Sequence, residues 1–495
     1  MNEIVEEPLA RAIHPEYWTG KQKACFGCMQ LIAPAELLVC SACQLANYCA
    51  QKCLLHDAQE HKWECHVLAG SGKDDDLKAA DLRLTGRLLS LTLPSPSPFK
   101  QGFPTERKLE DLMNHAEQWK NDEIFENQWA AFQKHYKVIE NASSPFAKVD
   151  EEKFLDMFGK VQTNTFEVWS SNNIENLPAY TANALYLQSS RFDHSCEPSL
   201  RRFFDGSRLV TTPVDPNLRL SQLPPTSFNN LTISYSYSDG LIAPTAERRE
   251  HLEKCFYFRC ICPKCQDPAA NLRDWASTNR LCPTCTTPLL PATQGENCTL
   301  DPAEHPEVCL EQRDSELELD LVCSSCQHSE AIPLASFNAA MAAAMRLAED
   351  SSLLTYPRRE AKRLLADLGL AEALLHPSAN AWLFLARRRL FHMWQEMLLA
   401  EGAGKKVRKN KTALASMSRQ GEEVWTGFQR FAPLAGELGF VTATCSRIAA
   451  LQGDKEGELM WLRRCLQLWT AKTRSNFHLL HSINQTISEL QLLSM

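Results

Sequence analysis

The sequence predicts a multidomain α+β protein in which bound metal replaces part of a hydrophobic core. Its 495 residues are about three times the length of an ordinary domain. Short β-like segments lie between about 161 and 255, and helical periodicity runs from about 334 to 495. The chain also contains 20 cysteines. Half of them form Cys-x2-Cys pairs, which stand at 25/28, 40/43, 262/265, 282/285 and 323/326.

The overall composition is that of a folded protein, with 44% hydrophobic and 23% charged residues. A formal net charge of −8 argues against direct nucleic-acid binding. The acidic start, Met1 to Glu7, has no apolar run and predicts no signal peptide, and no stretch approaches the ~18 apolar residues of a membrane helix. We therefore expect a protein of the cytoplasm, the nucleus or both, with no membrane partner. Paired thiols in these reducing compartments bind metal instead of forming disulfides.

Helical and β-like segments alternate along the chain. Between 106 and 140, apolar residues recur at three- to four-residue steps and predict one or two amphipathic helices. Short strands are expected at 166–168, 208–210 and 231–235. From 334 onward we expect helix pairs similar to tetratricopeptide repeats, with a turn at Gly453 and Asp454.

The first cysteine cluster holds eight metal-ligand side chains in forty-one residues. The pairs are Cys25-x2-Cys28, Cys40-x2-Cys43, Cys49-x3-Cys53 and His61-x3-Cys65. Eight such ligands make two closed tetrahedral zinc sites, which are structural because no coordination position stays open. The spacing by itself does not say which ligands share a zinc. His61 and Cys65 are four residues apart and should lie on one face of a helix.

A second group of cysteines surrounds residue 260. Cys260, Cys262 and Cys265 supply three thiolates, and a zinc ion needs a fourth ligand. Cys196 and Cys255 are both available for that position.

Two further pairs, Cys282 with Cys285 and Cys323 with Cys326, are predicted to close a fourth, ribbon-like zinc site. Cys298 and Cys309 lie between the pairs and compete for the same metal. We favour the two outer pairs as the ligands.

The first cluster resembles a MYND zinc finger over all eight ligands. Ser190–Arg201 contains His194-Ser195-Cys196-x-Pro198, which, together with the strand ending in Ser234-Tyr235, resembles the core of SET methyltransferases. Cys260-x-Cys262-x2-Cys265 is similar to the post-SET segment. In this order the motifs resemble the SET- and MYND-domain lysine methyltransferases, in which the finger interrupts the SET domain.

The resemblance implies a ligand set for each zinc. In the MYND family the ligands interleave, so that one zinc is bound by Cys25, Cys28, Cys49 and Cys53, and the other by Cys40, Cys43, His61 and Cys65. The cysteine of the His-Ser-Cys motif completes the third site, which implies Cys196 with Cys260, Cys262 and Cys265.

The resemblance also implies the cofactor, S-adenosylmethionine, and the residues that contact it. Tyr235 matches the family's catalytic tyrosine. The expected cofactor contacts are Asn164, Ser190, Asp193, His194, Tyr235 and Phe258. Phe256 and Phe258 match positions that line the lysine channel. The attacking amine must be neutral although its free pKa is about 10.4, and an apolar aromatic channel disfavours the charged form.

The implied domains follow the same order. They are a remnant of the SET amino-terminal strands (1–24), the MYND finger (25–65), the SET insert and SET core (66–254), the post-SET segment (255–270), a cysteine-containing insert (271–333) and the helical layer (334–495). The chain departs from the family in three ways. Asp193 stands where asparagine is usual, and Phe256 stands where tyrosine is usual. In addition, no Gly-x-Gly cofactor motif precedes Cys25, so we expect either a clipped chain or a degenerate enzyme.

Two functions are therefore expected. The first is a chromatin-regulating protein-lysine methyltransferase that acts on histone or non-histone lysines. The alternative is a catalytically inactive adaptor that binds proline-containing peptides through its MYND finger, or other protein partners.

Overall fold

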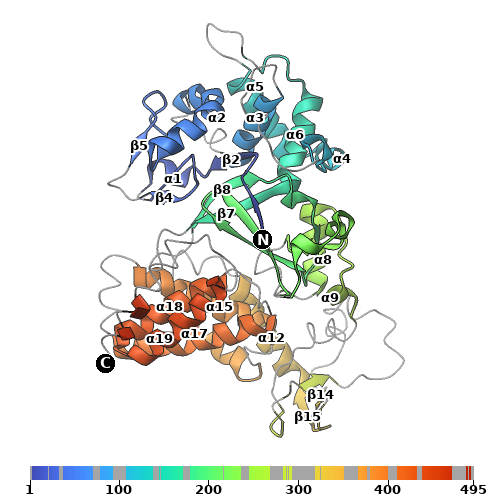
Figure 1. Cartoon of the computed structure of the whole chain (residues 1–495). Coiled ribbons are helices and arrows are strands. Elements are labelled where there is room, and N and C mark those ends of the chain that lie inside the picture. Colours follow the sequence, from blue (N-terminus) through green and yellow to red (C-terminus); the bar gives the residue numbers. More distant parts are fainter. Residues whose placement is uncertain are drawn as a thin grey trace. The chain divides into compact units, whose positions relative to one another are not determined.

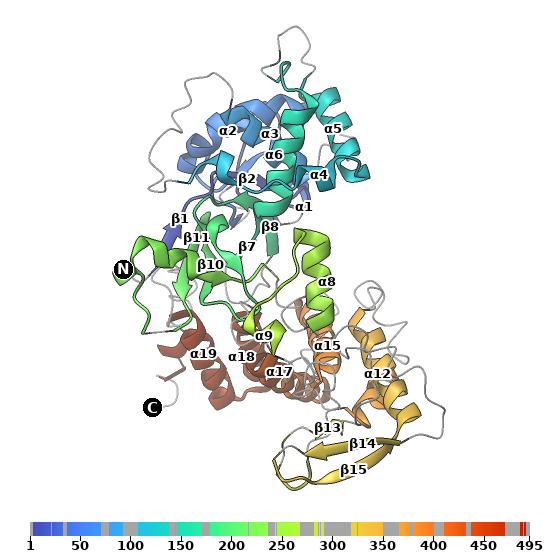
Figure 2. The ribbon, with the colours of Figure 1, turned by 90° about the vertical axis from the view of Figure 1, so that its right-hand side faces the viewer.

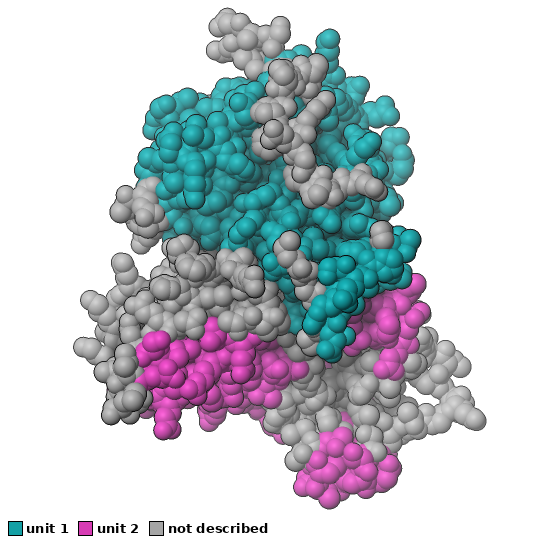
Figure 3. Space-filling view, viewed as in Figure 1, with its two compact units in different colours: residues 1–193, 198–233 teal, residues 194–197, 234–495 magenta. Residues whose placement is uncertain are grey.

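The structure, a computed structural model, divides the chain into two compact units (Figure 3). The first comprises residues 1–193 and 198–233, and the second comprises residues 194–197 and 234–495. The described residues are 3–20, 22–32, 37–70, 79–92, 107–137, 144, 146–170, 179–215, 217–235, 243, 245–267, 282–285, 287, 289–291, 318–323, 325–349, 366–375, 380–399, 410–431, 437–470, 486–488 and 490–491.

The strands of the first unit form two three-stranded antiparallel sheets and two short hairpins. One sheet has the order β1-β11-β10 and the other the order β2-β8-β7. The hairpins are β3-β4 and β5-β6. The bounds are β1 (Ile4–Glu6), β2 (Ala10–Ile13), β3 (Lys23–Ala24), β4 (Leu31–Ile32), β5 (Leu38–Val39), β6 (Asn47–Tyr48), β7 (Thr165–Ser170), β8 (Ala179–Leu185), β9 (Asp193–His194, where the chain passes into the second unit), β10 (Leu200–Asp205), β11 (Arg208–Pro213) and β12 (Thr232–Ile233).

Helices accompany these sheets. They are α1 (Glu16–Thr19), α2 (Gln51–Gly70), α3 (Ala80–Leu91), α4 (Ala116–Trp119), α5 (Glu123–His135) and α6 (Glu151–Asn164), with the 3₁₀ turns η4 (Leu109–Asp111), η5 (Ser189–Arg191), η6 (Leu220–Gln222) and η7 (Pro225–Asn230). In both ribbon views α2, α3, α5 and α6 group together above β7 and β8 (Figures 1 and 2).

The core of the first unit depends on small residues in β2 and large ones in the helices. Ala10 and Ala12 are buried in one hydrophobic cluster with leucines of α3, so α3 approaches the strand closely. Aromatic rings of α5 and α6 fill the rest of the cluster, as where Phe125 packs on Phe154 and Phe158. Aspartates begin both helices: Asp122 accepts a hydrogen bond from Ile124 N–H, and Asp150 from Lys153 N–H.

The second unit combines a small sheet with a layer of helices. Its antiparallel sheet has the order β13-β14-β15. The elements are α8 (Thr245–Phe256), α9 (Pro263–Gln266), β13 (Leu289–Pro291), β14 (Glu318–Cys323), β15 (Ser329–Pro333), α12 (Leu334–Glu349), α15 (Ala381–Leu399), α17 (Lys411–Phe431), α18 (Glu437–Gln452) and α19 (Lys455–Thr470).

Consecutive long helices of this layer pack on one another, α12 on α15 and so on to α19. Gly453 ends α18 with a left-handed φ of 75°, and the Asp454 side chain accepts a hydrogen bond from Gly457 N–H at the start of α19. Small residues let the helices approach, since a Cβ on Gly427 would lie 2.1 Å from the Phe384 ring. The predicted turn at Gly453 is confirmed.

The broad prediction of a mixed α and β protein with a helical carboxy-terminal part is confirmed. The expected strands at 166–168 and 208–210 lie within β7 and β11, whereas only Thr232 and Ile233 of the expected segment 231–235 form a strand. The helical stretch predicted within 106–140 is divided into η4, α4 and α5. Among the described residues, no helix is both long and apolar enough to cross a membrane.

One close contact in the first unit gives a direct test of this packing. A Cβ on Gly159, inside α6, would lie 2.0 Å from the backbone oxygen of Asn114. We expect Gly159→Ala to lower the free energy of unfolding by about 1–3 kcal/mol, because backbone must move to admit the methyl group. The measurement is the urea midpoint of the full chain followed by circular dichroism.

The matched control is Gly369→Ala, at a helical position where an added Cβ meets nothing within 4 Å. There alanine is expected to stabilise the helix by up to about 1 kcal/mol. Equal effects of the two substitutions would show that the contact at Gly159 is not as close as described.

Candidate metal centres and candidate active site

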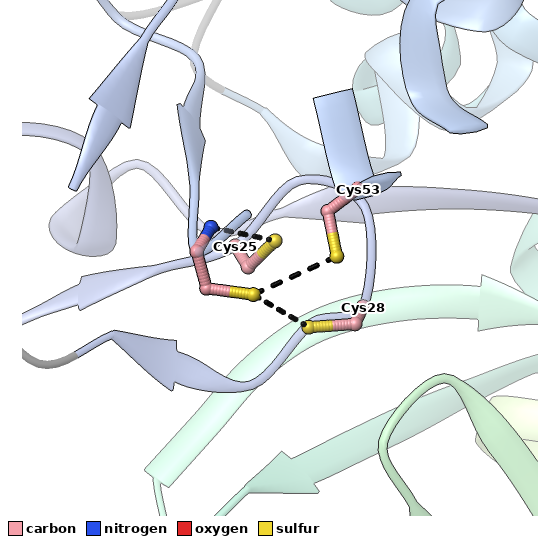
Figure 4. A group of neighbouring side chains, drawn as sticks. Cys25, Cys28 and Cys53 are labelled. Carbon is pink, nitrogen blue, oxygen red and sulfur yellow. Dashed lines mark hydrogen bonds between the residues drawn. The ribbon is translucent and has the colours of Figure 1, made fainter. Parts of the chain in front are cut away.

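The first metal-ligand cluster joins both hairpins of the finger to the start of α2. Cys25 follows β3, Cys49 follows β6, and Cys53 lies in the first turn of α2. The Sγ atoms of Cys28 and Cys49 are 3.6 Å apart, as are those of Cys49 and Cys53. Figure 4 shows the thiols of Cys25, Cys28 and Cys53 turned toward one another. All four ligand atoms lie within 4.8 Å of one another.

The second cluster consists of Cys40, Cys43, His61 and Cys65. The Sγ atoms of Cys40 and Cys65 are 3.8 Å apart, and Cys43 Sγ lies 3.6 Å from His61 Nε2. His61 and Cys65 occupy one face of α2, as their spacing predicts. The two groups are the interleaved sets that the family resemblance implies.

These separations suit zinc. A tetrahedral zinc with bonds of about 2.3 Å to sulfur places its ligand sulfurs about 3.8 Å apart. The observed sulfur–sulfur distances of 3.6–3.8 Å are close to that value, and they are far longer than the roughly 2.05 Å of a disulfide bond. Residues of these clusters therefore fit a metal and not a disulfide.

Zinc binds thiolates, and the surroundings favour the thiolate form. A hydrogen bond from the Cys28 thiol lowers the pKa of Cys25 to about 5. A hydrogen bond from the Cys196 thiol similarly lowers the pKa of Cys265 to about 6. Cys25 and Cys265 therefore ionise more readily than an ordinary cysteine, whereas their donors Cys28 and Cys196 have a raised pKa.

A buried network of charges adjoins the second cluster. It consists of Arg11 on β2, Asp57, Glu60 and Glu64 on α2, and Arg83 and Arg87 on α3. Arg87 bridges the carboxylates of Asp57 and Glu60 at 2.9 and 2.8 Å, and Arg83 lies 3.1 Å from Glu64. Three cations balance three anions, so the desolvated charges compensate one another.

This network reaches a predicted zinc ligand. The Oε1 atom of Glu64 lies 3.7 Å from Nδ1 of His61, whose Nε2 faces the cysteines. The separation is too long for a hydrogen bond, so the carboxylate acts on the ring through its negative charge, which raises the basicity of the imidazole. Although burial opposes ionisation, Arg83 and Arg87 hold the pKa of Glu64 well below its ordinary value. The carboxylate therefore stays charged.

The sequence interpretation missed this network. Its signal is present: Asp57, Glu60 and Glu64 follow a three- and four-residue spacing along one face of a helix, and Arg83 and Arg87 are four residues apart. Such spacing is also common on solvated surfaces. These charged side chains are buried only because α2, α3 and β2 pack together.

The third cluster lies in the second unit and consists of Cys196, Cys260, Cys262 and Cys265. The Sγ atoms of Cys196 and Cys265 are 3.6 Å apart. Cys255, the other candidate for the fourth position, is exposed and lies beside His251. The structure thus gathers Cys196, not Cys255, with the three thiols.

Two arginines of α8 support this cluster. The Arg248 guanidinium lies 3.7 Å from Cys265 Sγ. Its positive charge there offsets the negative charge of the thiolates. Arg249 donates to the backbone oxygens of Cys260 and Cys265 at 3.1 and 2.9 Å. The helix thereby fixes the loop that carries three of the four ligands.

An aromatic group lies beside the third cluster. The ring of Tyr235 lies 5.3 Å from that of Phe256 and 6.1 Å from that of Phe258, edge to face with the latter. The His194 ring lies 5.4 Å from Tyr235 and 5.8 Å from Phe258. The structure therefore brings together four of the residues predicted to contact the cofactor or line the lysine channel.

His194 connects this aromatic group to the metal ligands. Its Nδ1 accepts a hydrogen bond of 2.9 Å from the backbone N–H of Tyr235. The Nδ1 atom therefore carries no proton, and the neutral ring bears its hydrogen on Nε2, 3.4 Å from Cys196 Sγ. In this tautomer His194 donates to the sulfur and positions the Tyr235 backbone.

The remaining predicted contacts, Asn164, Ser190 and Asp193, lie in the first unit. Asn164 ends α6 and donates to the backbone oxygens of Lys160 and Met113 at 2.9 and 2.8 Å. The Ser190 hydroxyl donates to Tyr186 O at 2.6 Å, and Asp193 is exposed. Their roles toward a cofactor stay predictions.

Glu6 is a further buried residue that sequence reasoning missed. Its carboxylate accepts hydrogen bonds from the N–H groups of Gln188 and Ser189, at 2.6 and 2.9 Å, and from the Ser189 hydroxyl. Burial raises its pKa above the ordinary value, against these hydrogen bonds. Glu6 thereby attaches β1 to the turn η5, which contains Ser190.

Comparison with known proteins places these features in context. The family described as MYND finger matches residues 25–65. The chain is 28% identical over 259 residues to SET domain-containing protein 14 of Caenorhabditis elegans, covering 51% of this chain and 53% of that protein. It is 25% identical to histone-lysine N-methyltransferase SMYD3 of Homo sapiens, covering 48% and 50%. It is 26% identical to N-lysine methyltransferase SMYD2-B of Danio rerio, covering 46% and 48%.

The matched stretches thus span about half of this chain and about half of these relatives. The chain contains a MYND finger, and over that part it is similar to SET- and MYND-domain proteins, several of which are named as lysine methyltransferases. The resemblance inferred from the motifs is confirmed at this level.

The buried charge network generates a stability prediction. We expect Arg87→Ala to lower the free energy of unfolding by about 3–5 kcal/mol, because Asp57, Glu60 and Glu64 lose a shared cation without regaining water. Chemical denaturation of the zinc-loaded full chain, followed by tryptophan fluorescence, measures the change.

Arg208→Ala is the matched control, since Arg208 pairs with Asp205 while its side chain stays 45% exposed. That substitution is expected to cost roughly 0–1 kcal/mol. If Arg87→Ala were no more destabilising than the control, the network would not be buried as described.

Proposed function

Because the chain carries a MYND finger and matches SET- and MYND-domain lysine methyltransferases over about half its length, we propose that it is a protein-lysine N-methyltransferase. S-adenosylmethionine is its proposed methyl donor, and a histone or non-histone lysine is its acceptor. The observation that carries the proposal is the group formed by Tyr235, Phe256 and Phe258, with His194 holding the Tyr235 backbone.

The aromatic group suits a cationic sulfonium and a lysine side chain. Ring faces attract cations, and Tyr235, Phe256 and Phe258 pack partly buried against one hydrophobic cluster. Low polarity around the amine disfavours its protonated form, so that it presents a lone pair. When bound, S-adenosylmethionine supplies an activated methyl group for in-line displacement. The residues of this chain contribute positioning and electrostatics.

Tyr235 is the proposed catalytic residue because its ring lies beside those of both phenylalanines. Its hydroxyl is proposed to orient the incoming nitrogen and the methyl group. His194 is a positioning residue, since both of its ring nitrogens lie beside protein atoms. The other proposed cofactor contacts, Asn164, Ser190 and Asp193, belong to the first unit. The zinc ions are proposed to be structural.

A second candidate function rests on the finger. Leu38 and Val39 form β5 and are 38% and 36% exposed, and Leu55 on α2 is 63% exposed. Apolar side chains in such positions favour contact with an extended peptide. We therefore propose proline-containing peptides as partners, in an adaptor role that holds even without catalysis. The cytoplasm or nucleus is the proposed location.

Cofactor binding separates the two functions. Isothermal titration of the zinc-loaded full chain with S-adenosylmethionine is expected to show binding at one site. No heat at millimolar cofactor would remove the methyltransferase proposal for this chain and would leave the adaptor role as its function.

Tyr235→Phe tests the proposed catalytic residue. We expect methyl transfer from labelled S-adenosylmethionine to a histone mixture to fall at least about 100-fold, because the variant loses the hydroxyl and keeps the ring. Zinc content, measured by mass spectrometry, should not change. Tyr17→Phe in α1 is the control and should retain activity. Full turnover by Tyr235→Phe would refute the assigned role.

A further inference from the structure

A fourth group of thiols lies outside the finger and outside the candidate active site. Cys282 and Cys285 precede β13, Cys323 ends β14, and Cys326 lies in the turn between β14 and β15. The Sγ atoms of Cys282 and Cys326 are 3.4 Å apart, those of Cys285 and Cys323 are also 3.4 Å apart, and all four lie within 4.8 Å of one another. Cys298 and Cys309, the competing ligands, lie outside the described residues.

We propose that these four cysteines bind a fourth zinc ion, which joins the Cys282/Cys285 pair to the Cys323/Cys326 pair and is independent of the proposed methyl transfer. The sulfur distances exclude disulfides, whose bond is about 2.05 Å, and approach the edges of a zinc–thiolate tetrahedron. Four soft donors select zinc over the hard cations magnesium and calcium. Four ligands also fill the coordination shell, which leaves no position for Cys298 or Cys309.

The backbone around the new site repeats the turn that builds the MYND finger. In the finger, Cys25 N–H donates to Gln30 O at 2.8 Å, five residues ahead. Cys282 N–H donates to Thr287 O, and Cys323 N–H to His328 O, at the same spacing and each at 2.8 Å. This turn holds both cysteines of a pair toward one point.

The Cys25/Cys28 turn and the Cys323/Cys326 turn also share an uncommon conformation. Met29 follows the second cysteine of its pair with a φ of 62°, and Gln327 follows Cys326 with a φ of 61°. Both N–H groups donate to the oxygen of the pair's first cysteine, at 2.8 and 2.9 Å. A left-handed φ is rare for residues other than glycine, so its recurrence at the same position indicates the same ligand turn.

Backbone amides also face the sulfur atoms. Thr284 N–H lies 3.4 Å from Cys282 Sγ, and Cys326 N–H lies 3.5 Å from Cys323 Sγ. In the first cluster, Cys49 N–H faces Cys25 Sγ at 3.4 Å. Such donors stabilise thiolates, and they are present in both places.

The metal would tie distant parts of the chain to the helical layer. Cys285 and Cys323 are separated by 38 positions, and closing so long a loop has an entropic cost that a metal offsets. Cys282 and Cys323 also belong to a hydrophobic cluster with Leu289, Ile332 and Phe337. The zinc is therefore placed beside the hydrophobic cluster that residues of β13, β14, β15 and α12 form together.

Metal counting tests the proposal in the full chain. Inductively coupled plasma mass spectrometry is expected to find about four zinc ions per chain and about three in Cys326→Ser. Cys255→Ser is the matched control, because Cys255 is also exposed but belongs to none of the four groups, and it should retain four. A wild-type count of three, or an unchanged count in Cys326→Ser, would overturn the proposal.

Thiol reactivity of the unsubstituted chain gives a second test that does not depend on a variant folding. N-ethylmaleimide should label Cys255 quickly and Cys326 at least about tenfold more slowly, although both thiols are exposed, because a zinc-bound thiolate is not free to react. A zinc chelator should remove the difference, as read by peptide mass spectrometry. Equal labelling before chelation would contradict the fourth site.

Discussion

The mutual repulsion of converging thiolates is the constraint on which much of this structure depends. Four groups of four donors meet within 4.8 Å, and so many anionic sulfurs stay together only when a cation neutralises them. The segments that carry them are hairpins, turns and single helix ends, which bury little apolar surface of their own. Clusters that fit a metal lie in both units, and coordination there would supply the cross-links that a larger core otherwise provides.

In the first unit, the buried network of arginines and carboxylates also stabilises the region beside the second cluster. Glu64 faces the ring of His61 on one side and the guanidinium groups of Arg83 and Arg87 on the other. The finger is thus joined to the neighbouring helix by charges that cannot be removed singly without leaving a buried partner unpaired. A zinc site and a protein core share one carboxylate, which explains why charged residues occupy positions where a helix would ordinarily place leucine.

In the second unit, the third cluster contributes to the candidate active site. Its cysteines belong to one hydrophobic cluster with α15, α17 and α18, and Tyr235, Phe256 and Phe258 pack against that cluster. His194 bridges the two groups, because its Nδ1 accepts a hydrogen bond from the Tyr235 backbone and its Nε2 lies beside Cys196 Sγ. The same residues that would bind a structural metal thereby set the position of the aromatic group, so metal binding and the geometry of the proposed reaction are physically linked.

Spacing along the chain identified the paired cysteines as metal ligands, because two cysteines separated by two residues converge on one point through a local turn, but it did not say which pairs share a metal. It also determined the helical carboxy-terminal part and the turn at Gly453, which depend on periodicity and on one backbone conformation. Only the tertiary structure decided that Cys196 and not Cys255 joins the third cluster, and that Asp57, Glu60 and Arg87 are buried. Those outcomes require segments far apart in sequence to meet. Desolvation makes a buried charge costly and a buried thiol inaccessible, and it arises only when the chain is packed.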